Sequence, residues 1–257
     1  MDKDKLIELH RYDARARSQL SASGTAPTNG EFGSNAMPPY LRTPYIFYEK
    51  CMRELIGSQD QVLELGAGSG LHTWALVQTG AQVTATDISP ASLNLLAQRI
   101  VNAGASVKTQ VADMESLPFA DASFDVVASA GSLSYGDPTL VDAEIRRVLR
   151  PRGMLVCVDS LNHNPIYRLN RWLHYLRGDR TKSTLQHMPD LARIEALCNG
   201  FTNVNVHYFG ALSFAMPAVA RLCGPERAQT VSDFFDRLIR VKRSAFKFVL
   251  VAKVKQI

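Results

Sequence analysis

Hydrophobic and polar positions follow two patterns that alternate along the middle of the chain. Short apolar runs that end at a polar residue or a turn predict strands at residues 61–65, 82–87, 107–112, 124–130, 154–159, 202–208 and 246–255. Apolar residues at helical spacing predict helices at residues 71–79, 90–103, 139–149 and 190–198. Because strand and helix patterns alternate, we expect a parallel sheet with helices on both faces.

The segments outside this alternation are helical or irregular. Residues 4–20 and 41–56 have helical spacing, whereas residues 21–39 between them are rich in Gly, Ser, Asn and Pro, which favours a loop. A long connection, residues 210–244, precedes the final strand and holds one or two predicted helices. We expect one domain over residues 1–257, made of an N-terminal helical cover (1–57), a core (58–160), a substrate-side insertion (161–189) and a C-terminal part (190–257).

The most informative motif follows the first predicted strand. Gly66, Gly68 and Gly70 lie between a buried strand and a helix pattern. Glycine allows a tight turn and close approach of a ligand, and a helix N-terminus offers free N–H groups. Asp87 ends the next strand, about 20 residues on, as expected of a carboxylate that binds a ribose diol. Leu71 stands where a dinucleotide fingerprint has its last glycine, so the spacing disfavours a pyrophosphate site.

The run Glu64-Leu-Gly-Ala-Gly-Ser-Gly70 resembles motif I of the class I S-adenosylmethionine-dependent methyltransferases, of the small-molecule methyltransferase-11-like type. Later motifs of that family are matched in order by residues 87–89, 111–119, 123–127 and 148–155, although Arg152 replaces the first glycine of the usual L-K-P-G-G turn. The resemblance implies an α/β fold with a Rossmann-like seven-stranded sheet, mostly parallel with an antiparallel last strand, and S-adenosyl-L-methionine as the cofactor.

The resemblance also implies roles in cofactor binding. Asp87 is expected to bind both ribose hydroxyls and Ile88 to pack on the adenine, while Asp113 and the N–H of Met114 hold the adenine edge. The turn residues belong to the same expected site, namely Glu64, Gly66, Ala67, Gly68 and Gly70. Simpler interpretations stay open at single positions, with Asp87 as a helix cap and Asp113 as a solvated turn residue.

Composition and charge narrow the class of protein. No apolar run reaches the roughly 18 residues of a membrane span, and the charged N-terminus lacks a signal-peptide core, so we expect a cytoplasmic protein. The 4 scattered cysteines contain no C-x-x-C pair, and no acidic or histidine cluster has ligand spacing, so we expect no metal. A net charge of +5 permits an anionic substrate and gives no reason to expect nucleic acid.

Candidates for the transfer chemistry follow the fourth and fifth predicted strands. Ligands of open α/β sheets bind outside the carboxyl ends of the strands. Ser129, Ser132, Ser134 and Tyr135 are therefore expected near the reactive group, although the serines could equally be loop hydrogen bonders. His163 is the preferred general base, because an imidazole titrates near neutrality, and Asp159 is expected to orient it. The competing interpretation of His163 is a loop histidine that caps backbone groups.

The segment ahead of the core carries aromatic and cationic side chains. Related enzymes fold such segments over the cofactor, so we expect Tyr40 or Tyr45 to cover its methionine part and Arg42 to meet its carboxylate. A surface linker with a packing helix is the alternative. His187 is a reserve candidate for the base, and His72 is expected on the cofactor side or at the surface.

Residues 165–182 give the main indication of the acceptor. Ile166, Leu169, Leu173 and Leu176 share one face of a predicted helix, with arginines around them. In order of preference, the segment is an amphipathic lid, a site for a phosphate-bearing acceptor such as a nucleotide-linked or lipid-linked sugar, or a contact with a membrane surface.

The sequence thus predicts methyl transfer to a small molecule, preferably O-methylation of a sugar or glycoconjugate precursor, with a quinone or other secondary metabolite next. A nicotinamide-dependent oxidoreductase is the alternative from another class. Such an enzyme would need a catalytic set such as Y-x-x-x-K. Tyr135 does not begin one, because Thr139 and not lysine stands four residues after it. A non-catalytic cofactor-binding protein is the third hypothesis. The sequence leaves the oligomeric state open.

Overall fold

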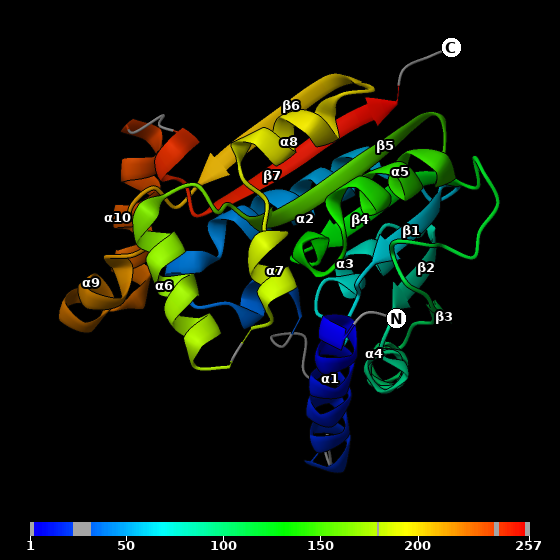
Figure 1. The fold of residues 1–257 in the computed structure, drawn as a ribbon, viewed down its shortest axis with the longest axis horizontal. Coiled ribbons are helices and arrows are strands. Elements are labelled where there is room, and N and C mark those ends of the chain that lie inside the picture. Colours follow the sequence, from blue (N-terminus) through cyan, green and yellow to red (C-terminus); the bar gives the residue numbers. More distant parts are fainter. Residues whose placement is uncertain (1–2, 23–31, 179, 239–241, 255–257) are drawn as a thin grey trace.

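The fold is built on a seven-stranded sheet with the strand order β3-β2-β1-β4-β5-β7-β6 (Figure 1). The computed structural model describes residues 3–22, 32–178, 180–238 and 242–254. The strands are β1 (Gln61–Leu65), β2 (Gln82–Asp87), β3 (Lys108–Val111), β4 (Phe124–Ala130), β5 (Leu149–Ser160), β6 (Phe201–Phe209) and β7 (Lys247–Val254). Strands β1 to β5 pair in parallel, and β7 runs antiparallel to β5 and β6. The predicted mostly parallel sheet with an antiparallel last strand is confirmed.

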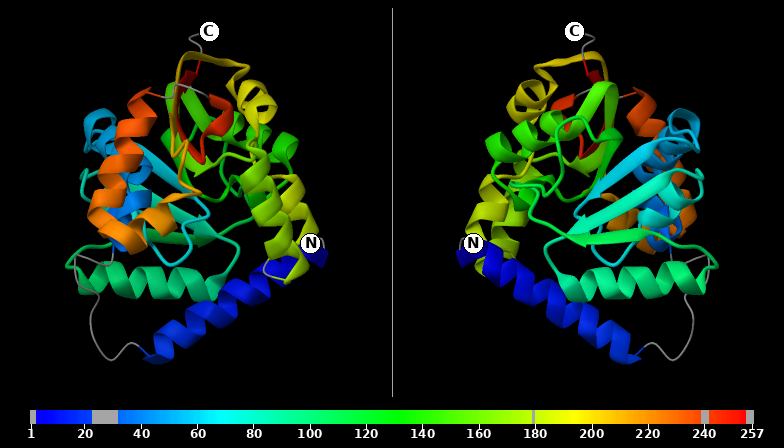
Figure 2. Two further views of the ribbon diagram at one scale, coloured as in Figure 1. Left: turned by 90° about the vertical axis from the view of Figure 1, so that its left-hand side faces the viewer. Right: turned by 90° about the vertical axis from the view of Figure 1, so that its right-hand side faces the viewer.

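Helices cover both faces of the sheet and cross its carboxyl edge (Figures 1 and 2). They are α1 (Lys3–Ala22), α2 (Thr43–Leu55), α3 (Thr73–Val77), α4 (Pro90–Asn102), α5 (Pro138–Val148), α6 (Pro165–Leu176), α7 (Lys182–Gln186), α8 (Leu191–Cys198), α9 (Met216–Cys223) and α10 (Pro225–Leu238). Short 3₁₀ turns are η2 (Gly33–Ala36), η3 (Pro39–Leu41), η4 (Leu133–Tyr135) and η5 (Lys242–Ser244). Helix α3 is shorter than predicted because Leu71 and His72 still belong to the glycine turn.

The central strands are apolar on both faces because each face carries its own core. Leu63 of β1 and Val127 of β4 belong to the core beneath α5 and α8. Their neighbours Val62 and Val126 point to the opposite face and pack with α2 and α3. Successive side chains of a strand point to opposite faces, so a strand covered on both sides has a continuous apolar run. This explains why β1 and β4 were readily predicted.

Helix α1 lies across the carboxyl edge of the sheet and runs alongside α4, as both views of Figure 2 show. Ala16 of α1 packs on Ala91 and Leu95 of α4. Helix α4 itself begins at Ser89, whose hydroxyl caps the N–H of Ser92. Of the predicted loop at residues 21–39, residues 23–31 lie outside the described residues. Residues 21 and 22 end α1, and the part from residue 32 onward contains η2 and the start of η3.

Candidate functional site

A cavity of about 390 Å³ opens at the carboxyl ends of the parallel strands, above the glycine turn. Gly66 and Gly68 have φ values of +61° and +54°, which favour glycine over other residues. A Cβ at Gly66 would overlap the side chain of Ser132, whereas Gly68 has nothing within 4 Å of its Cβ position. The first glycine is therefore needed for packing against the loop after β4, and the second leaves open space for a ligand.

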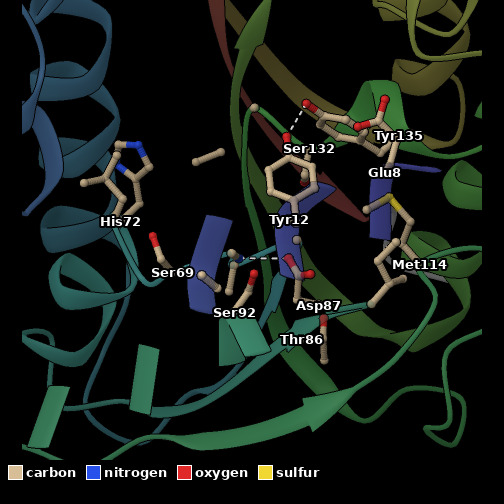
Figure 3. A pocket seen from close by; sticks show the side chains of 18 of the residues that line it. Glu8, Tyr12, Ser69, His72, Thr86, Asp87, Ser92, Met114, Ser132 and Tyr135 are labelled. Atoms are coloured by element: carbon tan, nitrogen blue, oxygen red, sulfur yellow. Dashed lines mark hydrogen bonds between the residues drawn. The ribbon is translucent and has the colours of Figure 1, made fainter. Parts of the chain in front are cut away.

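Asp87 is held at the end of β2 with its carboxylate facing the turn (Figure 3). The N–H of Gly68 donates to its Oδ2 and the N–H of Ser89 to its Oδ1, both at 2.9 Å. Burial raises the pKa of Asp87 above its ordinary value, and the two backbone donors oppose this. Each carboxylate oxygen can accept a further hydrogen bond, so Asp87 can receive hydroxyls of a ligand in the cavity.

The next wall comes from β3 and from α1. Asp113 and Met114 line the cavity together with Ile88. Lys5 of α1 reaches over this wall, with its Nζ 2.6 Å from Oδ2 of Asp113 and 2.5 Å from Oε2 of Glu115. The carboxylate of Asp113 thus has a cationic partner from a helix more than a hundred residues away in the chain.

Two further residues of α1 close the cavity. The hydroxyl of Tyr12 lies 2.5 Å from that of Tyr135, across the opening (Figure 3). Glu8 is buried, and its Oε1 accepts hydrogen bonds from the hydroxyls of Thr181 and Thr184 at 3.0 and 3.2 Å. Burial raises the pKa of Tyr135, so its hydroxyl stays neutral and serves as a hydrogen-bonding group. These contacts fasten α1 to α7 as well as to α4.

The cavity extends towards β5 and β7, where Tyr45, His72, Ser160 and Lys247 line it. The ring of His72 stacks on that of Tyr45 at 4.9 Å, and its Nδ1 is buried without a hydrogen-bond partner. Burial, aided by the charge of Lys247, lowers the pKa of His72 to about 4. At neutral pH its imidazole is uncharged.

The expected catalytic pair, His163 and Asp159, is not among the residues that line the cavity. His163 is half-buried in the loop after β5. Asp159 is fully buried, and its carboxylate accepts from the N–H of Leu133 at 3.0 Å and of Ser160 at 2.6 Å. Asp159 therefore holds the loop after β4 against β5. The reserve candidate His187 is not a lining residue either.

The expected cover residues Tyr40 and Arg42 also lie away from the cavity. The Nε of Arg42 donates to the carbonyl of Met37 at 2.9 Å, and its Nη1 lies 3.7 Å from Glu226. Tyr40 borders a separate crevice beside Phe209. Tyr45, the other residue expected to cover the cavity, does line it, together with Met37 of the same segment and residues of α1.

Several residues expected to bind the cofactor lie behind the turn instead of in the cavity. Glu64 is buried and accepts from the hydroxyl of Thr73 at 2.6 Å, and burial raises its pKa to about 7. A Cβ at Gly70 would lie 2.7 Å from Cγ of Leu96, so this glycine permits packing on α4. The remaining two, Ser129 and Ser134, are buried and do not line the cavity.

The insertion helix α6 is turned the opposite way from a lid. Its leucine face points to solvent, with Leu169 and Leu176 each 58% exposed. Arg171 is buried instead, and its Nη1 donates to the carbonyl of Leu161 at 2.8 Å and to Oδ1 of Asn162 at 3.0 Å. None of residues 165–178 or 180–182 lines the cavity. The segment therefore does not cover this cavity, although Arg180 and Lys182 border a separate crevice beside Arg11. A phosphate site on the segment and contact with a membrane surface stay predictions.

Sequence reasoning missed Lys5, Glu8, Tyr12 and Lys247 as lining residues. The three residues of α1 belong to no local motif, and their long-range contacts carry no pattern in the sequence. Lys247 had one signal, a cation at the start of an otherwise apolar strand run. In the described part of the chain, no group of three His, Cys, Asp or Glu residues could hold a metal ion. Among the same residues, no helix has the length and hydrophobicity required to cross a membrane.

Comparison with known proteins shows what the core is similar to. Residues 63–157 match the family model Methyltransf_11, a methyltransferase domain. The chain is 32% identical over 121 residues to the uncharacterized methyltransferase YodH of Bacillus subtilis, covering 47% of this chain and 52% of that one. It is 38% identical over 113 residues to the demethylmenaquinone methyltransferase of a Mycobacterium species, covering 42% and 45%. The chain thus spans about half the length of these relatives.

A solved structure shares the fold over nearly the whole chain. Phosphoethanolamine N-methyltransferase 2 of Haemonchus contortus, in complex with phosphomonomethylethanolamine and S-adenosylhomocysteine, aligns with a TM-score of 0.63. The alignment covers 99% of this chain and 60% of that one at 18% identity. The likeness supports the fold, including helices outside the matched core.

Proposed function

We propose that the chain transfers a methyl group from S-adenosylmethionine to a small molecule, which the match of residues 63–157 to a methyltransferase domain supports. The observation that carries this proposal is the position of Asp87, which faces the open glycine turn and is fixed by the N–H of Gly68 at 2.9 Å. A carboxylate so placed suits a ribose diol. The absence of a side chain at Gly68 leaves room for the ligand.

The lining residues divide the work of binding. Asp87 would take the ribose hydroxyls, and Ile88, Asp113 and Met114 would surround the adenine. Ala67 and Gly68 would face the methionine part, with Tyr12 closing the cavity above. When bound, the cofactor supplies an electrophilic methyl group, so the chain needs only to align the acceptor in line with it and exclude water.

The acceptor enters, on this proposal, at the end of the cavity near β5 and β7. The two side chains there that could take a proton are weak bases at neutral pH. The pKa of His72 is lowered to about 4, and the hydroxyl of Tyr135 is neutral and bonded to Tyr12. A phenol, quinol or acid loses its proton readily, whereas a sugar hydroxyl needs a stronger base.

We therefore favour O-methylation of an acidic acceptor. The likeness of 42% of the chain to a demethylmenaquinone methyltransferase supports a quinol-type ring. Methylation of a sugar or glycoconjugate precursor stays a prediction. Among the residues that suggested it, His163 and the arginines of α6 do not line the cavity. In the hydride-transfer alternative, no lysine follows Tyr135 at the required spacing.

Isothermal titration calorimetry with S-adenosylhomocysteine tests the cofactor assignment, with NADH and NADPH as controls. We expect a Kd of about 1–10 μM for S-adenosylhomocysteine and none measurable for the nicotinamide cofactors. Binding of a nicotinamide nucleotide instead would overturn the proposal. Methyl transfer from labelled S-adenosylmethionine to a panel of phenols, quinols, carboxylic acids and sugars then ranks the acceptor classes.

A further inference from the structure

Lys247 is a buried cation that forms no ion pair with the described residues. Lys247 is 7% exposed. It begins β7 and pairs with Ser160 of β5. The ammonium donates to Oγ of Ser160 at 3.3 Å and lies 5.0 Å from the centre of the Tyr45 ring. No carboxylate oxygen of the described residues lies within 4.0 Å of it. Since a buried ammonium is costly when unpaired, and Lys247 lines the cavity, its surroundings suit an anion that comes from outside the chain.

The acidic residues nearby are already engaged. The charge of Lys247 opposes the rise in the pKa of Asp159 that burial causes. The two carboxylate oxygens of Asp159 accept hydrogen bonds from the backbone N–H groups of Leu133 and Ser160. Farther along the cavity, Asp113 pairs with Lys5 and Glu8 binds the threonines of α7. Among the described residues, Lys247 thus has a charge interaction with Asp159 but no carboxylate in ion-pair contact.

His72 gives a second, independent indication of a ligand. Its Nδ1 is buried without a hydrogen-bond partner, although the side chain lines the cavity. Buried polar atoms are almost always hydrogen-bonded, so a bound molecule is expected to satisfy this nitrogen. His72 and Lys247 both contact the ring of Tyr45, which places the two groups at the same end of the cavity.

The sheet order separates this end from the ribose site. Asp87 ends β2 and Lys247 begins β7, with β1, β4 and β5 between them. Four strand spacings of about 4.8 Å put the two backbones roughly 19 Å apart. A nucleoside bound at β2 and β3 therefore lies at the opposite end from Lys247.

We propose that Lys247, Ser160 and His72 form the acceptor subsite and that the acceptor carries an anionic oxygen group. This inference rests on the proposed function. Lys247 binds that group, which is a carboxylate or an equally compact anion, and Ser160 positions the ammonium. Tyr45 forms the floor between Lys247 and His72. An acceptor recognised in this way arrives already charged, which agrees with the weak bases in the cavity.

The test uses acetate as the smallest carboxylate probe and acetamide as its neutral counterpart. Binding of each to the full chain saturated with S-adenosylhomocysteine is measured by NMR line broadening, up to about 100 mM. The variant is Lys247→Met, which keeps the length of the side chain and removes its charge, with Lys247→Gln as a second variant. Lys253→Met, an exposed position of the same strand, is the matched control.

We expect acetate affinity to fall about tenfold or more in both Lys247 variants and to stay unchanged in Lys253→Met. Acetamide should not distinguish the proteins. Equal acetate binding by wild type and Lys247→Met, or none by wild type, would overturn the subsite. A loss of more than about tenfold in S-adenosylhomocysteine affinity in Lys247→Met would also overturn it, because the anion would then be the carboxylate of the cofactor.

Failure of the proposed function is recognised separately. If wild type does not bind S-adenosylhomocysteine, the cofactor assignment is wrong. Titration of the ligand-free protein with acetate still reports whether Lys247 binds an anion.

Discussion

The two ends of the cavity differ in how their polar groups are satisfied. Above β1, β2 and β3, Asp87 is bonded to Gly68 and Asp113 to Lys5. Above β5 and β7, the ammonium of Lys247 has a hydroxyl but, among the described residues, no carboxylate, and Nδ1 of His72 has no partner. The carboxylates at the first end thus have partners within the chain. The second end has charge and hydrogen-bonding capacity to spare, which is what an acceptor subsite requires.

The largest expected effect concerns cofactor binding at the end of the cavity where Asp87 lies. Asp87→Ala removes the ribose acceptor and leaves the N–H of Gly68 without its partner, so we expect affinity for S-adenosylhomocysteine to fall about a thousandfold, or about 4 kcal/mol. Calorimetry measures this, with the exposed Glu195→Ala as the control. Unchanged affinity in Asp87→Ala would remove the ribose assignment.

Glu64 lies at the same end of the cavity, and a variant at this position distinguishes a structural role from a role in cofactor binding. Its pKa is raised from 4.5 to about 7, mainly by burial. The folded state therefore binds more protons than the unfolded state between those pH values, and the stabilising effect is present below pH 4.5 and lost as the pH rises through 7. In Glu64→Gln this loss, about 3 kcal/mol, should disappear.

Chemical denaturation at pH 5 and pH 8 measures the free energies of unfolding of wild type and Glu64→Gln. S-adenosylhomocysteine affinity should stay the same, because Glu64 does not line the cavity. A large loss of affinity without a change in the pH dependence of stability would return Glu64 to the binding site.

Helix α1 joins the two ends, and Glu8 fastens it to α7. Glu8→Ala leaves the hydroxyls of Thr181 and Thr184 without this acceptor, at a cost of about 1–3 kcal/mol. We expect faster amide hydrogen exchange throughout α1 and about tenfold weaker binding of S-adenosylhomocysteine, because Tyr12 no longer closes the cavity. Arg17→Ala, an exposed position of the same helix, should change neither. Unchanged exchange in Glu8→Ala would show that α4 alone holds the helix.

The smallest effect concerns the loop after β5. His163→Ala should leave turnover within about twofold at every pH, since His163 is half-buried and does not line the cavity. His72→Phe should lower turnover while S-adenosylhomocysteine still binds. Steady-state kinetics with an acceptor found by the panel measures both. The reverse order would restore His163 as the base and weaken the comparison between the two ends.

The sequence by itself determined the sheet and the end of the cavity where Gly68 and Asp87 lie. The strands β1, β2 and β4 begin and end where their patterns predicted. In β1 and β4 the reason is that a strand buried on both faces has a nearly continuous apolar run. The glycine turn and Asp87 follow those strands directly, and parallel register brings Leu65 beside Thr86. Local spacing is thus sufficient to bring Gly68 and Asp87 together.

The tertiary structure alone decided what covers the cavity and where its free charge lies. Glu8 meets Thr181 and Lys5 meets Asp113 across more than a hundred residues, and no local pattern records such contacts. In α6 the sequence showed which residues share a face, but burial of Arg171 against Leu161 and Asn162 turns that face outward. Lys247 reaches the cavity because β7 is antiparallel to β5, which places its first residue at the carboxyl ends of the other strands. Strand pairing between distant segments fixes that position, and local pattern does not.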